Sequence, residues 1–127
     1  DPRRAVLLRS FESGHTNVDR IEALIRHLGM KNPPVPMDSQ AKYAMLAAGY
    51  GEIILRMPSP DAPDYREKIW DHAGGVVVLE EAGGRVTDIE GKPYDFTRGR
   101  RLEANTGLLA SNGAVHDAVL EAIRRTA

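Results

Sequence analysis

The chain has 127 residues, of which 17 are basic and 18 acidic, so its formal net charge is −1. This length suits a single domain that buries roughly two-thirds of its unfolded surface, and the balanced charge gives no reason to expect a nucleic-acid or membrane partner. Cysteine is absent, which excludes disulfides and thiolate metal sites. No apolar run approaches a membrane span, and the N-terminus has no signal-peptide pattern. We expect a soluble, cytoplasmic domain.

The first part of the chain predicts a strand, a helix and an extended connection. Residues 5–8 are an apolar run typical of a buried strand. After a turn and a helix cap at residues 14–17, apolar side chains recur at helical spacing at Val18, Ile21, Leu24, Ile25 and Leu28. Gly29 ends this helix, because glycine accepts the left-handed conformation that closes helices. Closely spaced prolines at 33–36 then impose an extended segment.

A second helix is expected to begin at Ser39, which suits an N-cap, and to end at Gly49. Its predicted apolar face is formed by Ala41, Ala44, Met45 and Ala48. Residues 53–55 predict the next buried strand, and a proline-containing loop follows it at residues 58–63.

Further strands are predicted at residues 85–89 and 107–111, separated by a turn at 90–91 and an irregular segment at 91–106. The last helix carries an apolar stripe of Val115, Ala118, Val119, Ala122 and Ile123. Strands that alternate with helices indicate an α/β fold with a largely parallel or mixed sheet flanked by helices.

The strongest chemical pattern is the run from Lys68 to Gly75, closed by Glu81-Ala82-Gly83-Gly84. In it Asp71 stands just before residues with almost no side chain, so that backbone and carboxylate can approach a charged ligand together. Asp71 can cap the following helix and direct an oxygen at a hard cation such as Mg²⁺. By spacing alone, the run favours an ordinary N-cap on a close-packed helix.

This run resembles the C-terminal signature of the inositol monophosphatase-like phosphatases, which are metal-dependent and lithium-sensitive; the matching residues are Trp70-Asp71-His72-Ala73-Gly74-Gly75 and Glu81-Ala82-Gly83-Gly84. Further runs are similar to those of the 3'(2'),5'-bisphosphate nucleotidases, namely Met37-Asp38-Ser39-Gln40-Ala41-Lys42-Tyr43, Leu55-Arg56 and Lys68-Ile69-Trp70-Asp71-His72. Those enzymes remove the 3'-phosphate from adenosine 3',5'-bisphosphate. At Gly74 the family usually carries a second alanine, a departure that we expect to be harmless.

The resemblance spans essentially the whole chain and implies the C-terminal half of an inositol monophosphatase-like fold. It also implies a helix at residues 76–78, where propensity alone predicts a strand. Family members carry most metal ligands on an N-terminal half, in a Glu-rich helix and an Asp-Pro-x-Asp-Gly-Thr segment, and neither is present here. We expect residues 1–127 to be the single C-terminal domain of a longer phosphatase, without that N-terminal metal-binding half and inactive alone.

By the same resemblance, Asp71 is a metal ligand at the substrate, and the nucleotide contacts are His15, Ser39, Lys42 and Arg56. Two or more Mg²⁺ ions are implied, ligated mostly by the absent half. The implied partners are a small-molecule nucleotide phosphate and that missing domain. The residues themselves are compatible with such roles, since Lys42 lies one turn into its helix and Arg56 ends a strand, both common places for anion contacts.

Two other functions stay open. An inositol monophosphatase would act on a polyol or sugar phosphate, but those relatives tend to carry an acidic residue near Arg56 and lack the match at Lys42. Basic residues at both places suit a ligand with a second phosphate. The other possibility is a nucleotide-binding module without catalysis.

The remaining polar and aromatic residues are interpreted as structural. We expect His27, His72 and His116 to be structural or surface residues, and Trp70 to be packed in the core beside the site. The arginines at residues 98–101 are expected to form a solvated loop.

Overall fold

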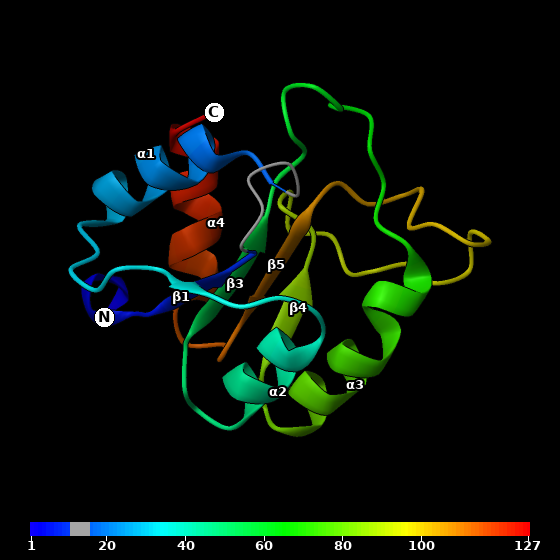
Figure 1. Ribbon diagram of the computed structural model, residues 1–127, viewed down its shortest axis with the longest axis horizontal. Helices are drawn as coiled ribbons and strands as arrows, with labels where there is room; N and C mark the ends of the chain where they lie inside the picture. The colour runs from blue at the N-terminus through cyan, green and yellow to red at the C-terminus, as the bar shows by residue number, and fades with distance from the viewer. Residues whose placement is uncertain (11–15) are drawn as a thin grey trace.

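The computed structural model describes residues 1–10 and 16–127 and shows a mixed sheet between two pairs of helices (Figure 1). In these ranges the strands are β1 (Leu7–Arg9), β2 (Val35–Pro36), β3 (Ile53–Arg56), β4 (Arg85–Thr87) and β5 (Leu108–Ser111). The helices are α1 (Val18–Leu28), α2 (Ala41–Ala47), α3 (Ala73–Glu81) and α4 (His116–Arg125), with short 3₁₀ turns η1 (Pro2–Arg4) and η3 (Ile69–Asp71). The predicted α/β class is confirmed.

The described strands form one sheet in the order β2-β1-β3-β5-β4. β1 pairs in parallel with β2 and β3, whereas β5 runs antiparallel to β3 and β4. The sheet is therefore mixed, one of the two forms expected. Because β1 and β3 are parallel, their carboxyl ends lie at the same edge, and the pairing of Arg56 with Leu108 brings the start of β5 to that edge as well.

Alternate residues of the central strands face opposite sides of the sheet, and each side is covered by one helix pair. One buried cluster joins β1 and β3 to α1 and α4, and the other joins them to α2 and α3. Leu7, Ile53 and Leu55 belong to the first cluster, and Leu8 and Ile54 belong to the second. The strands are therefore buried on both faces, as their continuous apolar runs predicted.

Local signals set the ends of α1 as predicted. The Asn17 side chain accepts a hydrogen bond from the backbone N–H of Arg20 at 3.2 Å, and Gly29 closes the helix with a φ of +65°. In α3 the helix at residues 76–78 is also confirmed, because Val76 and Leu79 are buried against the sheet and tertiary packing outweighs valine's preference for strands. No helix in residues 1–10 and 16–127 combines the length and apolar character needed to cross a bilayer.

The buried faces of two helices differ from those predicted. In α2 the buried residues are Lys42, Tyr43 and Leu46, while the three alanines at positions 41, 44 and 48 are exposed. In α4 Ala118 is exposed and Leu120 is buried in its place. Large side chains remove more apolar surface from water than alanine does, so packing selects the face that carries them.

Candidate functional site

A cavity of about 690 Å³ opens at the edge of the sheet where β1 and β3 end. Its wall includes Ser10 after β1, Arg56 at the end of β3 and Leu108 at the start of β5. The start of α2 and much of the segment 57–72 complete the wall. Ligands of open α/β sheets bind at the carboxyl ends of strands, and the volume is typical of a small-molecule site.

Four of the five predicted contacts line this cavity, namely Ser39, Lys42, Arg56 and Asp71. They come from the start of α2, the end of β3 and the turn η3, so the fold unites residues that lie far apart in the sequence. His15 lies outside the described residues. The next residue, Thr16, accepts a hydrogen bond at its Oγ1 from the backbone N–H of Met57 at 3.0 Å, and Met57 lines the cavity.

Ser39 shapes the entry to α2. Its φ of +64° is a left-handed conformation that residues with a side chain rarely adopt, and such conformations cluster at functional sites. Its Oγ accepts a hydrogen bond from the backbone N–H of Ala41 at 3.2 Å. The serine therefore does bind an amide of the first turn, although Gln40 occupies the N-cap position.

Lys42 is a buried lysine whose ammonium reaches the cavity wall. Its Nζ donates to the backbone oxygens of Met37 at 3.2 Å and Ser39 at 3.3 Å. An ammonium has three donors, so one N–H remains to bind a ligand in the cavity. Burial, followed by repulsion from Arg56, holds the pKa of Lys42 below its usual value. An anion placed between these two cations would relieve that repulsion.

Arg56 is held by a carboxylate that sequence reasoning missed. Its Nε lies 3.2 Å from Oε1 of Glu67 in an ion pair, and only 18% and 6% of the two side chains are exposed. Glu67 directly precedes the signature run, but nothing in the local sequence pairs it with a strand residue eleven positions earlier. The predicted position of Arg56 at the end of a strand is confirmed.

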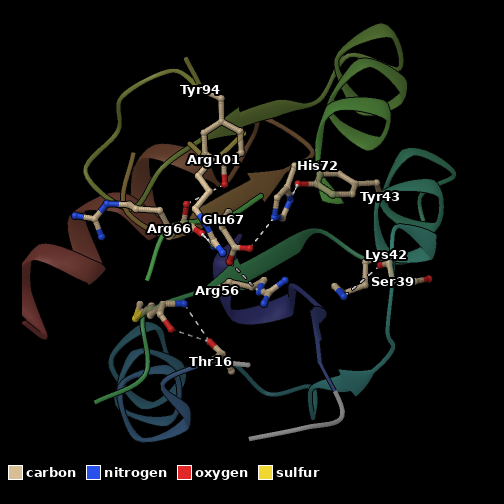
Figure 2. A network of polar contacts seen from close by, with 12 residues as sticks. Thr16, Ser39, Lys42, Tyr43, Arg56, Arg66, Glu67, His72, Tyr94 and Arg101 are labelled. Atoms are coloured by element: carbon tan, nitrogen blue, oxygen red, sulfur yellow. Dashed lines mark hydrogen bonds and ion pairs between the residues drawn. The ribbon is translucent and has the colours of Figure 1, made fainter. Parts of the chain in front are cut away.

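The same carboxylate continues into a polar network that spans α2, α3 and β3 (Figure 2). Oε2 of Glu67 contacts Nε2 of His72 at 3.0 Å, and Nδ1 of His72 contacts the Tyr43 hydroxyl at 2.7 Å. Burial, and then the charge of Glu67, raise the pKa of Tyr43. His72 is thus a structural residue, as predicted, whereas the role of Tyr43 was missed although it belongs to the matched run 37–43.

Asp71 does not cap α3, contrary to the prediction. It ends the 3₁₀ turn η3, so His72 occupies the N-cap position and its side chain makes no capping hydrogen bond. Gln40, the N-cap residue of α2, binds the first turn of α3 instead, because its Oε1 accepts from the backbone N–H of Gly75 at 2.9 Å. Its Nε2 also donates to the Trp70 carbonyl at 3.3 Å. The exposed Asp71 carboxylate is therefore not engaged in helix capping.

A divalent-metal site does not form from the described residues alone. Among them, no group of three or more acidic, histidine or cysteine side chains has the geometry to hold an ion. Asp71 and Asp38 are carboxylates in the cavity wall, where Asp71 is exposed. Mg²⁺ takes six oxygen ligands, so these residues fit at most a part of its shell.

Trp70 is exposed, so its predicted place in the core is wrong. Half of its surface is accessible, at 51%, because it lies on the turn η3 with its ring outside both buried clusters. The side chains of Lys68 and Arg100 lie 5.7 and 5.4 Å from its ring centroid. Arg101, expected in a solvated loop, is half-buried and donates from Nη1 to the Arg66 carbonyl at 2.9 Å.

Solved structures share this fold. The inositol monophosphatase from Anabaena (Nostoc) sp. PCC 7120 matches with a TM-score of 0.68 and 25% identity, covering 98% of this chain and 45% of its own. An inositol monophosphatase from Thermotoga maritima matches with a TM-score of 0.70 and 21% identity, covering 98% of this chain and 42% of its own. The second likeness shows the fold alone.

Curated relatives carry the name 3'(2'),5'-bisphosphate nucleotidase. That of Emericella nidulans is 45% identical over 98% of this chain and 35% of its own length. That of Oryza sativa is 44% identical over 98% and 34%, and that of Schizosaccharomyces pombe is 48% identical over 87% and 31%. The chain therefore spans about a third of the length of these relatives.

The sequence model of the inositol monophosphatase family matches residues 4–126, which is nearly the entire chain. The match includes the signature run, β3 and the start of α2, the elements that build the cavity. The chain belongs to the inositol monophosphatase family.

Proposed function

We propose that this chain is the ligand-binding part of a metal-dependent phosphatase that removes the 3'-phosphate from adenosine 3',5'-bisphosphate or its sulfated form. The observation that carries the proposal is the pair of cations, Lys42 and Arg56, in the wall of one cavity. An inositol monophosphate has a single phosphate, whereas a bisphosphate nucleotide has one phosphate to lose and another to be held. The names of the curated relatives support the same substrate class.

The geometry supports a role for these cavity residues in binding the nucleotide rather than in hydrolysis. The remaining N–H of Lys42 and the guanidinium of Arg56 are suited to bind the phosphate that is not hydrolysed, because charge-assisted hydrogen bonds to phosphate are the strong ones. Ser39 offers its hydroxyl beside Lys42. His15 is a further proposed contact. These groups bind and orient the nucleotide, and none of them is assigned a step in the attack of water.

Asp71 is proposed as one ligand of Mg²⁺, the ion on which this family of phosphatases generally depends. The carboxylates in the described cavity are too few to hold the ion, so we assign no step of the hydrolysis to this chain. We propose that residues 1–127 form a C-terminal domain, and that the other metal ligands come from an N-terminal domain of a longer, cytoplasmic protein. The share of the relatives' length that the chain covers supports this arrangement.

The test compares two substrates in the intact protein. Losing a hydrogen bond to a charged group costs about 1.5–3 kcal/mol, so Lys42→Ala and Arg56→Ala should each weaken the use of adenosine 3',5'-bisphosphate by about tenfold or more. Hydrolysis of inositol 1-phosphate should change far less. Arg85→Ala is a matched control, because Arg85 lies on β4 and is exposed. Equal losses on both substrates would favour an inositol monophosphatase, and no loss on either would remove the support for a nucleotidase.

A further inference from the structure

Glu67 is a buried carboxylate whose two oxygens hold different partners (Figure 2). Oε1 lies 3.2 Å from Nε of Arg56 in an ion pair, and Oε2 lies 3.0 Å from Nε2 of His72. Arg56 ends β3, whereas His72 is the N-cap residue of α3 and directly follows Asp71. One side chain therefore connects the proposed phosphate contact to the backbone beside the proposed metal ligand.

The hydrogen bonds of this network fix where its protons lie. A guanidinium only donates and an ionised carboxylate only accepts. A neutral His72 must then donate from Nε2 to Glu67, which leaves Nδ1 to accept from the Tyr43 hydroxyl at 2.7 Å. Each ring nitrogen has one role, and the charge of the glutamate decides which nitrogen carries the hydrogen.

We infer that Glu67 is a positioning residue, which holds Arg56 by an ion pair and His72 in its Nε2–H form, and so determines the affinity for the second phosphate of the ligand. The ligand rests on the proposed function, while the hydrogen-bond arrangement does not. Because the guanidinium is paired with a buried carboxylate, its position in the cavity wall is set before a phosphate arrives. Preorganisation of this kind raises affinity by lowering the entropy lost on binding.

Two substitutions of Glu67 separate the effect of its charge from the effect of its side-chain length. Glu67→Gln removes the charge and keeps the length of the side chain. Since Arg56 can only donate, the new amide must turn its oxygen to Arg56 and its NH₂ group to Nε2 of His72, which must then accept. Nδ1 becomes the protonated nitrogen and donates to Tyr43. Glu67→Asp keeps the charge but is one methylene shorter, so it can no longer reach both partners.

The tautomer is read by ¹⁵N NMR of the histidine rings in the intact protein, with His72 assigned from its missing signals in His72→Gln. We expect the Nε2–H form in the unsubstituted protein and in the control Glu81→Gln, an exposed position on α3. We expect the Nδ1–H form in Glu67→Gln. An Nδ1–H or doubly protonated ring in the unsubstituted protein would overturn the inference even if no variant folded, and so would an unchanged tautomer in Glu67→Gln.

Calorimetric titration with adenosine 3',5'-bisphosphate and with inositol 1-phosphate gives the second readout. Glu67→Asp should lose about tenfold or more of its affinity for the bisphosphate, as for one charge-assisted hydrogen bond, and Glu67→Gln should stay within about threefold. Any other order of the two variants would overturn the positioning role. If the unsubstituted protein bound no bisphosphate, the proposed function would fall, and the tautomer alone would decide the role of Glu67.

Discussion

Two neighbouring glycines in α3 provide a sharp test of how this helix packs. A methyl group added at Gly75 would lie 2.3, 2.5 and 2.9 Å from Cδ2, Cγ and Cβ of Tyr43, well inside van der Waals contact. These atoms form the base of a buried side chain whose hydroxyl is bonded to His72, so they cannot swing aside. At Gly74 the nearest atom is Oε1 of Gln40 at 3.3 Å, the far end of a flexible side chain.

Glycine to alanine inside a helix gains about 1 kcal/mol from propensity, and this gain is similar at both positions. Overpacking a core costs about 1–3 kcal/mol. Gly75→Ala should therefore be less stable than Gly74→Ala by about 1–3 kcal/mol, whereas Gly74→Ala should equal or slightly exceed the unsubstituted protein. Urea unfolding followed by circular dichroism measures both. Variants of equal stability would refute the close contact between α3 and Tyr43.

The other predictions concern protonation, the metal and catalysis. His116 is buried between Thr87 and Ser111, and burial lowers its pKa from 6.5 to about 4. As pH falls below 6.5, His116 binds a proton in the unfolded chain but not in the folded chain. The free energy of unfolding should therefore drop by up to about 3 kcal/mol on approaching pH 4. Urea titrations across this range should show the drop in the unsubstituted protein and a smaller one in His116→Gln; parallel curves would contradict it. In the intact protein Asp71→Asn should raise the Mg²⁺ concentration needed for activity and leave metal-free thermal unfolding almost unchanged, and a normal Mg²⁺ dependence would remove Asp71 from the metal site. The isolated 127-residue chain should release phosphate from adenosine 3',5'-bisphosphate with Mg²⁺ only at background, an expectation that turnover like that of an intact family enzyme would refute.

Signals that act over a few residues were read correctly from the sequence. The Asn17 cap and the Gly29 stop define α1, and the apolar run before Arg56 became β3 with the arginine at its end. These features depend on backbone conformation and on hydrogen bonds between near neighbours, which the local sequence carries. The residues of the cavity wall were identified differently, through resemblance to a family, and four of them proved to lie together.

Tertiary structure alone decided which partners those residues have. The burial of Tyr43 and Leu46 defines the inner face of α2, and Lys42 on the same face lies in the cavity wall. The side chain of Gln40 binds the backbone of Gly75, 35 residues later, in the first turn of α3. Asp71 therefore does not cap this helix. Glu67 pairs with Arg56 because the loop before α3 lies beside β3. Burial and polar pairing depend on distances between remote segments, and a linear pattern does not encode those distances.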